Sequence, residues 1–162
     1  MRIHIVIRVK PGAYHTVFED LQDKFIDSRI NGLLGDYDII FTRELRDEND
    51  YYDTIVKQVM TDGNIKPAQS FIVIKPMKKE SQEQETAYIF INLIPGSGEY
   101  VQQRLLAYTE VLSADIVSGN FDMIAQVSIK NVHQLWRFLG EVAHIQGVCR
   151  TVTHLVPEAF SR

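Results

Sequence analysis

The chain has 162 residues, of which 45% are hydrophobic and 23% charged, and its formal net charge at pH 7 is −4. These proportions are typical of a globular protein, and they argue against a disordered chain and against a general affinity for nucleic-acid phosphates. A single cysteine, Cys149, excludes an intrachain disulfide and cysteine-rich zinc motifs. Because the sequence has neither a membrane-spanning apolar run nor a signal-peptide layout, we expect a cytoplasmic protein.

The sequence contains an internal repeat. Three turn signals of the first half recur 84 residues later, and apolar positions between them keep the same register. The paired signals are Pro11-Gly12 and Pro95-Gly96, Gly-Asp-Tyr-Asp at 35–38 and Gly-Asn-Phe-Asp at 119–122, and Gly63 and Gly147. One register held across three separate turns predicts two copies of one structural module.

The first copy has the pattern strand, helix, two strands, helix, strand. Residues 3–9 alternate and are β-branched, which predicts a half-buried strand that ends at Pro11-Gly12. Val17, Leu21 and Phe25 then follow one helical face at intervals of four. Two strands at 28–34 and 37–45 are joined at Gly35-Asp36, a second helix carries Ile55 and Val59, and a strand at 69–74 closes the copy.

The second copy repeats this order, with strands at 88–93, 113–118, 121–129 and 151–156. The order βαββαβ predicts an α+β fold of two tandem ferredoxin-like modules, of the dimeric α+β barrel type. Each module would have an antiparallel four-stranded sheet with both helices on one face. We expect the first module at 1–76 and the second at 87–162. The polar run between them, 77–86, suits an exposed linker or a frayed helical extension.

A module of this kind leaves one sheet face without helices. A unit of about 75 residues buries only part of its surface, and apolar residues on the uncovered face need a cover. A second sheet packed about 10 Å away would supply it. The sequence leaves open whether the two modules of one chain cover each other or whether the pairing is between chains.

From Glu110-Val111 onward the second copy resembles a known family, and the resemblance covers nearly all of residues 87–157. The matching segments are Val-Ser-Gly-Asn-Phe-Asp-Met at 117–123, Leu-Gly-Glu at 139–141, and Gly147-Val148 through Thr-Val-Thr-His-Leu-Val at 151–156. They resemble the effector domain of the leucine-responsive regulatory protein (Lrp)/AsnC family, called the regulation of amino acid metabolism (RAM) module. The first copy is a weaker match, carried by Pro11-Gly12, the 35–38 turn and Gly63.

The resemblance implies domains that dimerise through their sheets, assemble into rings and bind free amino acids at the contacts between dimers. The chain departs from the usual family member in two ways. Its first strand begins at Ile3, which leaves no room for the helix-turn-helix domain that precedes the effector domain, and two modules are fused. Direct binding to nucleic acid is therefore not expected.

The resemblance also implies which residues bind the ligand. The matching positions are Gly119, Asp122, Val132, His154, Leu155 and Val156 in the second copy, and Gly35 and Asp38 in the first. The Asp122 carboxylate can receive an α-ammonium group, and backbone N–H groups beside the glycine turn can receive an α-carboxylate. The alternative is that both aspartates accept hydrogen bonds from turn N–H groups and that the glycines only satisfy the turns.

The sequence contains no motif typical of a metal site, a cofactor site or a catalytic group. The five histidines have no mutual metal-ligand spacing, and Cys149 has no partner histidine in a recognisable motif. We therefore expect a regulatory protein, and not an enzyme, that senses an amino acid or related small metabolite at an oligomer interface. It would form homo-oligomers, act on transcription through full-length Lrp/AsnC regulators, and have no membrane partner.

Two other classes of function remain open. One is a small enzyme of the dimeric α+β barrel superfamily, such as a monooxygenase, a haem-handling enzyme or a haem decarboxylase, with His133 and Trp136 as candidate residues. The other is a structural partner module whose exposed sheet edges recruit another protein.

Overall fold

The computed structural model describes residues 1–157. The chain divides into two compact units between Ile72 and Val73. Each unit has the element order β-α-β-β-α-β, which confirms an α+β fold of two tandem ferredoxin-like modules. Every helix in the described part of the chain is too short or too polar to span a bilayer.

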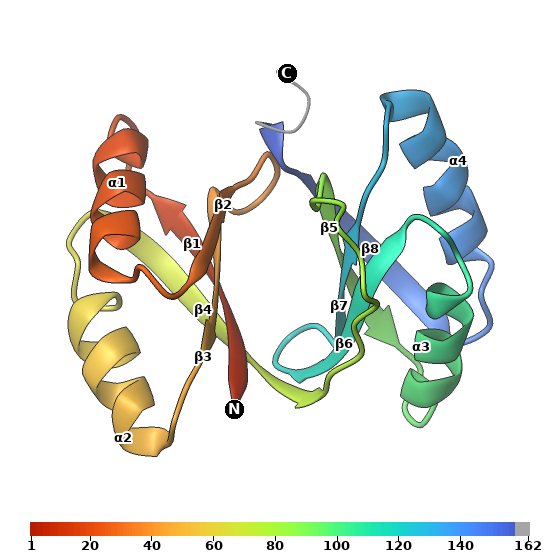
Figure 1. The fold of residues 1–162 in the computed structure, drawn as a ribbon, viewed down its shortest axis with the longest axis horizontal. Coiled ribbons are helices and arrows are strands. Elements are labelled where there is room, and N and C mark those ends of the chain that lie inside the picture. The colour runs from red at the N-terminus through yellow and green to blue at the C-terminus, as the bar shows by residue number, and fades with distance from the viewer. Residues whose placement is uncertain (158–162) are drawn as a thin grey trace. The chain divides into compact units, whose positions relative to one another are not determined.

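The first unit has an antiparallel sheet in the order β2-β3-β1-β4. Its elements are β1 (Arg2–Val9), α1 (Tyr14–Lys24), β2 (Arg29–Gly32), β3 (Ile39–Glu44), α2 (Glu48–Tyr51), a π-helical turn η1 (Tyr52–Val56) and β4 (Ile65–Lys75), whose last residues belong to the second unit. Figure 1 shows α1 and α2 on the same face of this sheet.

Alternate residues of β1 form the core of the first unit. Ile3, Ile5 and Ile7 are fully buried and lie in one cluster with Val17 and Leu21 of α1. Period-two spacing on the strand and period-four spacing on the helix bring these faces together. Each buried aliphatic side chain stabilises the unit by about 1.5–3 kcal/mol relative to an exposed one.

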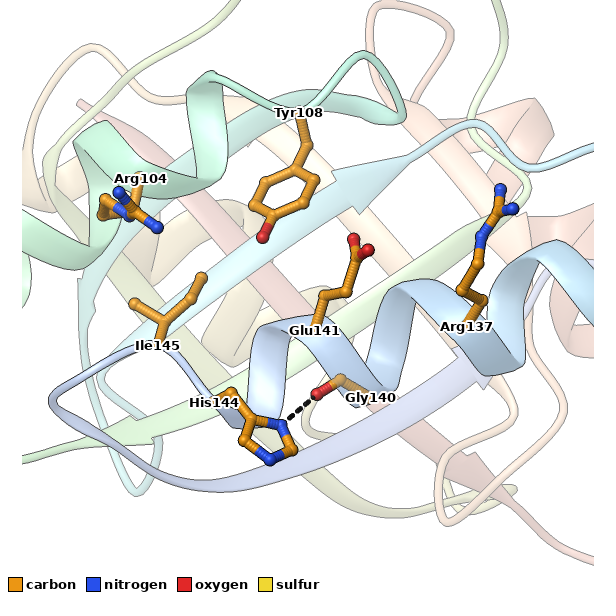
Figure 2. Close-up of a pocket in the computed structure, with 7 residues that line it drawn as sticks. All are labelled: Arg104, Tyr108, Arg137, Gly140, Glu141, His144 and Ile145. Atoms are coloured by element: carbon orange, nitrogen blue, oxygen red, sulfur yellow. Dashed lines mark hydrogen bonds between the residues drawn. The ribbon is translucent and has the colours of Figure 1, made fainter.

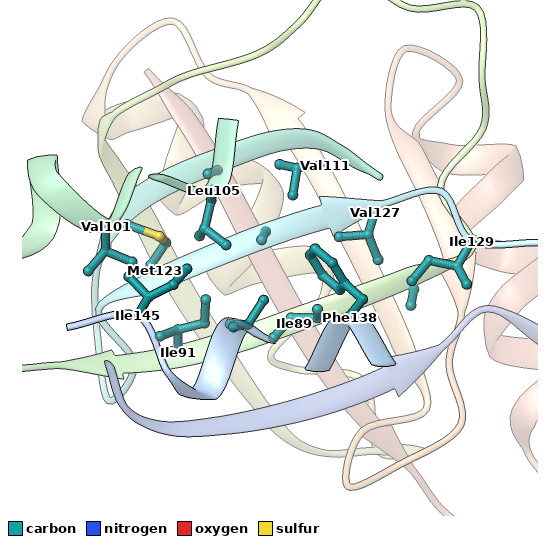
Figure 3. Close-up of a cluster of buried hydrophobic side chains, with 14 of the residues drawn as sticks. Ile89, Ile91, Val101, Leu105, Val111, Met123, Val127, Ile129, Phe138 and Ile145 are labelled. Carbon is teal, nitrogen blue, oxygen red and sulfur yellow. The ribbon is translucent and has the colours of Figure 1, made fainter. Parts of the chain in front are cut away.

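The second unit has the same topology, with the sheet order β6-β7-β5-β8. Its elements are β5 (Ala87–Leu93), α3 (Gly98–Leu106), β6 (Val111–Ser118), β7 (Met123–Val127), α4 (Val132–Ala143) and β8 (Val148–Leu155). Ile89 and Ile91 of β5 pack with Leu105 of α3 and Phe138 of α4, so both helices cover one face of the sheet (Figure 3).

The chain between β4 and β5 contacts the edge of the second sheet. The Met77 carbonyl accepts a hydrogen bond of 2.9 Å from the Ala114 N–H, and the Lys79 N–H donates one of 2.9 Å to the Leu112 carbonyl. The polar composition of residues 77–86 predicts an exposed linker, and most of these residues are exposed, while Lys78 forms an antiparallel bridge with Ser113 of β6. The reason is that an edge strand presents unpaired backbone groups to any nearby chain, whatever its side chains.

The repeated glycines do not all have the same conformation. Gly12 and Gly96 both have a positive φ, of 85° and 88°, at the turn that precedes the first helix of each unit. Gly35 has a positive φ of 147°, whereas its repeat partner Gly119 does not lie in this region. Of the two hairpin glycines, Gly35 therefore has the positive φ that glycine tolerates and Gly119 does not.

Candidate functional site

Asp122 connects the β6–β7 turn to the end of β5. Its Oδ2 accepts a hydrogen bond of 2.7 Å from the Leu93 N–H. Its own N–H donates to the Ile91 carbonyl at 2.9 Å, and its carbonyl accepts from the Val117 N–H at 2.9 Å. A hydrogen bond to a carboxylate is about twice as strong as a neutral one, so Asp122 has a clear structural role in its turn.

Asp38 makes the same three hydrogen bonds in the first unit. Its Oδ2 accepts from the Val9 N–H at 2.8 Å, its N–H donates to the Ile7 carbonyl at 2.8 Å, and its carbonyl accepts from the Leu33 N–H at 2.8 Å. Both aspartates therefore accept a hydrogen bond from a backbone N–H at the end of a neighbouring strand, and not from their own turn. In each aspartate the other carboxylate oxygen, Oδ1, would be the atom that contacts a ligand.

A hollow of about 270 Å³ lies beside Asp122, where β5 ends and α3 begins. Its lining is otherwise apolar or made of backbone, and it consists of Leu93, Ile94, Pro95, Gly96, Gly98, Ile116, Val117 and Asp122. Asp122 is half-buried, and its Oδ1 makes no hydrogen bond within residues 1–157. A carboxylate oxygen at the edge of an apolar hollow can bind an ammonium group or a hydroxyl.

The sequence predicts Asp122 as a ligand residue but does not predict most of the residues around it. Pro95-Gly96 stands out in the sequence only as a turn signal, although it lines the hollow. No pattern in the sequence marks Gly98 and Ile116 as site residues, because only the packing of α3 against β6 places them at this site.

The eight expected ligand residues do not meet within one unit. Gly119 and Asp122 lie in the turn beside the end of β5. Leu155 pairs with Ala87 at the start of β5, and the Val156 N–H donates to the Thr86 carbonyl at 2.8 Å. The two groups therefore lie at opposite ends of β5.

Val132 belongs to the group at the start of β5. It begins α4, three residues after Ile129, whose N–H donates to Thr86 Oγ1 at 2.8 Å. Its side chain is 65% exposed, so it is available to another molecule.

His154 is fully buried in β8, opposite Tyr88 of β5. Its ring lies 4.7 Å from that of Phe90, at an angle of 37° between the planes. Aromatic packing of this kind stabilises the sheet face, and in this form of the protein His154 is not exposed to a diffusing ligand.

The residues proposed for an enzyme lie on the surface of α4. His133 is exposed, and Trp136 is 78% exposed. Within the described residues, no group of three His, Cys, Asp or Glu side chains could hold a metal ion.

The comparisons with known proteins give the family of the second unit. Residues 86–162 match the family model described as the Lrp/AsnC ligand binding domain. The HTH-type transcriptional regulator FL11 of Pyrococcus furiosus is 33% identical over 70 residues, which are 43% of this chain and 46% of the regulator. The chain therefore spans less than half the length of the curated relatives it matches.

The chain is also similar to two solved structures. A hypothetical protein from Pyrococcus horikoshii is 30% identical, covers 43% of this chain and 86% of its own, and has a TM-score of 0.41. The siroheme decarboxylase NirDL is only 8% identical but covers 96% of this chain and 71% of its own, with a TM-score of 0.73, so the likeness is one of fold alone. Because they match both this family model and the regulator sequence, residues 86–162 of this chain belong to the Lrp/AsnC ligand-binding domain family.

Proposed function

We propose that this chain is a regulatory protein that senses an amino acid or a related small metabolite at an oligomer interface. It acts on transcription through partner regulators, which we infer to be full-length members of the Lrp/AsnC family. The observation that carries this proposal is the match of residues 86–162 to the Lrp/AsnC ligand binding domain. The FL11 relative, by name an HTH-type transcriptional regulator, supports the regulatory part.

In this proposal the hollow beside Asp122 receives the ligand. Asp122 Oδ2 is held by the Leu93 N–H, so the carboxylate has a fixed direction, and Oδ1 can accept an ammonium group. Gly119 does not line the hollow but lies in the same turn as Asp122, and the ligand's carboxylate would extend toward the backbone N–H groups of that turn. Apolar residues such as Ile116 would contact its side chain.

The need for an oligomer follows from the positions of the other expected residues. Val132, Leu155 and Val156 lie at the far end of β5 from Asp122. Another molecule of the chain can bring this group to the Asp122 hollow. Within a single copy of the second unit, this group lies away from the hollow. Gly35 and Asp38 would form the equivalent, weaker half-site of the first unit.

The test measures ligand binding by the full chain. Thermal unfolding and native mass spectra are recorded with each of the twenty amino acids in turn. We expect one or more of them to raise the melting temperature, because a ligand that binds only the folded state stabilises it, and to change the assembly size.

Asp122→Asn separates the ligand contact from the structural role of Asp122. The asparagine carbonyl can still accept a hydrogen bond from the Leu93 N–H, but the negative charge is lost. We expect this variant to fold and to lose the response to the amino acid, whereas Asp38→Asn is the matched control in the first unit and keeps most of it. A complete panel without any change in stability or assembly would refute the proposal.

We propose that the chain is not an enzyme. The likeness to NirDL extends over both units but is one of fold, and the candidate residues His133 and Trp136 are exposed on α4. An absorbance titration with haem checks the alternative. A saturable Soret shift that is lost in His133→Ala would favour the haem-handling function over the regulatory one.

A further inference from the structure

A second, larger hollow lies on the helical side of the second unit, between α3 and α4. Its volume is about 480 Å³, within the usual range of small-molecule sites. Its floor includes the buried Ile145, and its rim carries ionisable side chains from both helices (Figure 2). None of the residues that line the Asp122 hollow belongs to it.

The charges around this hollow contrast with those of the whole chain. The chain has a net charge of −4, yet the hollow has two arginines, Arg104 and Arg137, and one carboxylate, Glu141. A further cation, Lys79, lies close by, since its Nζ donates to the Tyr108 carbonyl at 2.5 Å. The hollow therefore favours a ligand with more negative than positive charge.

The three charged groups are not neutralised by the protein. Within residues 1–157, the side chains of Arg104, Arg137 and Glu141 form no ion pair and no hydrogen bond. Arg137 and Glu141 are four residues apart on α4, but with the cation first, which is the weaker order for a helical ion pair. All three side chains are exposed and can reach a ligand.

The order of these charges indicates the ligand. In Figure 2 the Glu141 carboxylate lies between the Arg104 and Arg137 guanidinium groups, and the Tyr108 hydroxyl points into the space between Arg104 and Glu141. Two cations on either side of an anion match a molecule with two carboxylates and an ammonium group between them. Arginine binds a carboxylate through two parallel hydrogen bonds, and Glu141 would accept those of the ammonium group.

We propose that this hollow binds an acidic α-amino acid, that is, a dicarboxylate with an α-ammonium group. The proposal goes beyond the sensing site at Asp122, because it concerns another pair of elements and needs no second molecule. It would give the chain a binding site on the helical side of its Lrp/AsnC domain.

Gly140 provides a steric test of the same site. It lines the hollow, and a Cβ at this position would meet no atom within 4 Å. Gly140→Leu therefore adds a side chain to open space at the hollow, in a helix that tolerates leucine well.

The experiment is isothermal titration of the full chain with L-glutamate and L-aspartate. We expect saturable binding of at least one of them. L-Glutamine, which lacks the second carboxylate, and glutarate, which lacks the ammonium group, should each bind at least about tenfold more weakly, because each leaves a charged partner unsatisfied.

The variants assign the binding to this hollow. Arg104→Gln, Arg137→Gln and Gly140→Leu should each weaken L-glutamate binding by about tenfold or more. The control Lys130→Gln removes one positive charge at an exposed position outside the hollow and should change the affinity by less than about twofold, because distant charges are screened.

Three results would overturn the proposal. They are no binding of either acidic amino acid, equal binding of glutarate or inorganic phosphate, and unchanged affinity in both arginine variants. Asp122→Asn distinguishes this site from the proposed sensing site: affinity for L-glutamate that is lost in this variant and unchanged in both arginine variants would place the binding at the Asp122 hollow. Circular dichroism of each variant shows that a loss of binding is not a loss of fold.

Discussion

The Leu93 N–H donates a hydrogen bond of 2.7 Å to the carboxylate of Asp122. The Val9 N–H and Asp38 form the same pair at 2.8 Å in the first unit, 84 residues earlier. The repeat therefore preserves one specific contact between a turn and a strand end, and not only a pattern of apolar residues.

We expect Asp122→Ala to destabilise the second unit by about 1–3 kcal/mol, since it leaves a half-buried backbone N–H without its charged acceptor. Asp38→Ala should have a similar effect on the first unit. Urea unfolding measures these changes. Tryptophan fluorescence monitors the second unit, and far-UV circular dichroism monitors the whole chain. Asp36→Ala, at an exposed position of the same turn, is the control, and equal stability of Asp36→Ala and Asp38→Ala would contradict the prediction.

The glycine pair Gly63 and Gly147 should respond differently to alanine. Gly147 has a φ of +104°, and a Cβ there would lie 2.7 Å from Ser97 Cβ. Gly147→Ala should therefore cost about 1–3 kcal/mol of stability. A Cβ at Gly63 would meet no atom within 4 Å, and its φ is not positive, so Gly63→Ala should change stability by less than about 1 kcal/mol. Thermal unfolding of both variants compares them, and a larger loss for Gly63→Ala would count against this account.

Gln102 should hold the chain before β5 against the second unit. This fully buried side chain donates from Nε2 to the Ala114 carbonyl at 2.7 Å and to the Lys75 carbonyl at 3.1 Å. Gln102→Leu removes both hydrogen bonds and should destabilise the unit by about 1–3 kcal/mol.

Hydrogen exchange reports the local effect of Gln102→Leu. The amides of Ala114 and Lys79, which pair the segment with β6, should exchange faster in this variant. Gln103→Leu, at the next and exposed position of α3, is the control. Unchanged protection of both amides in Gln102→Leu would show that the strand pairing alone holds the segment.

Asp50 should make the stability of the chain depend on acid pH. A hydrogen bond of 3.0 Å from the Arg46 backbone N–H, together with the Arg46 charge, holds the pKa of this buried carboxyl below its ordinary value, although burial opposes the shift. The folded state therefore binds the proton more weakly than the unfolded state does. The stabilisation from Asp50 is fully present above the ordinary pKa of 3.8 and is lost as the pH falls through the folded pKa.

Urea unfolding between about pH 2 and pH 6 checks this dependence. Asp50→Asn should lower the stability at the upper end of the range and flatten the decline towards acid pH. Asp36→Asn is the control, and a decline as steep in Asp50→Asn as in the unmodified chain would show that other carboxyls cause it.

The fold follows from the sequence because its signals are local. Val17 and Leu21 lie at helical spacing and enter the core of the first unit as expected, and Val101 and Leu105 have the same spacing in the core of the second. Strand ends are less predictable. The pattern at 121–129 predicts one strand, whereas β7 is Met123–Val127, since Asp122 is held in the turn by its hydrogen bonds to β5 and β6.

The segment after β4 shows a structural feature that residue composition does not predict. Polar side chains at 77–86 predict an exposed linker, but they do not predict that the backbone of Met77 and Lys79 pairs with β6. Backbone donors and acceptors are the same in every residue except proline, so side-chain patterns do not reveal this pairing.

The sequence by itself determined the module and its duplication, because the apolar periods and turn residues recur in one register, and it predicted Asp122 as a ligand residue. Only the tertiary structure decided which side chains share a hollow. It placed Pro95-Gly96 beside Asp122, put Leu155 at the other end of β5, and brought Arg104 of α3 to Glu141 of α4. Helix packing and strand register create these neighbours, and both depend on contacts between residues far apart in the chain.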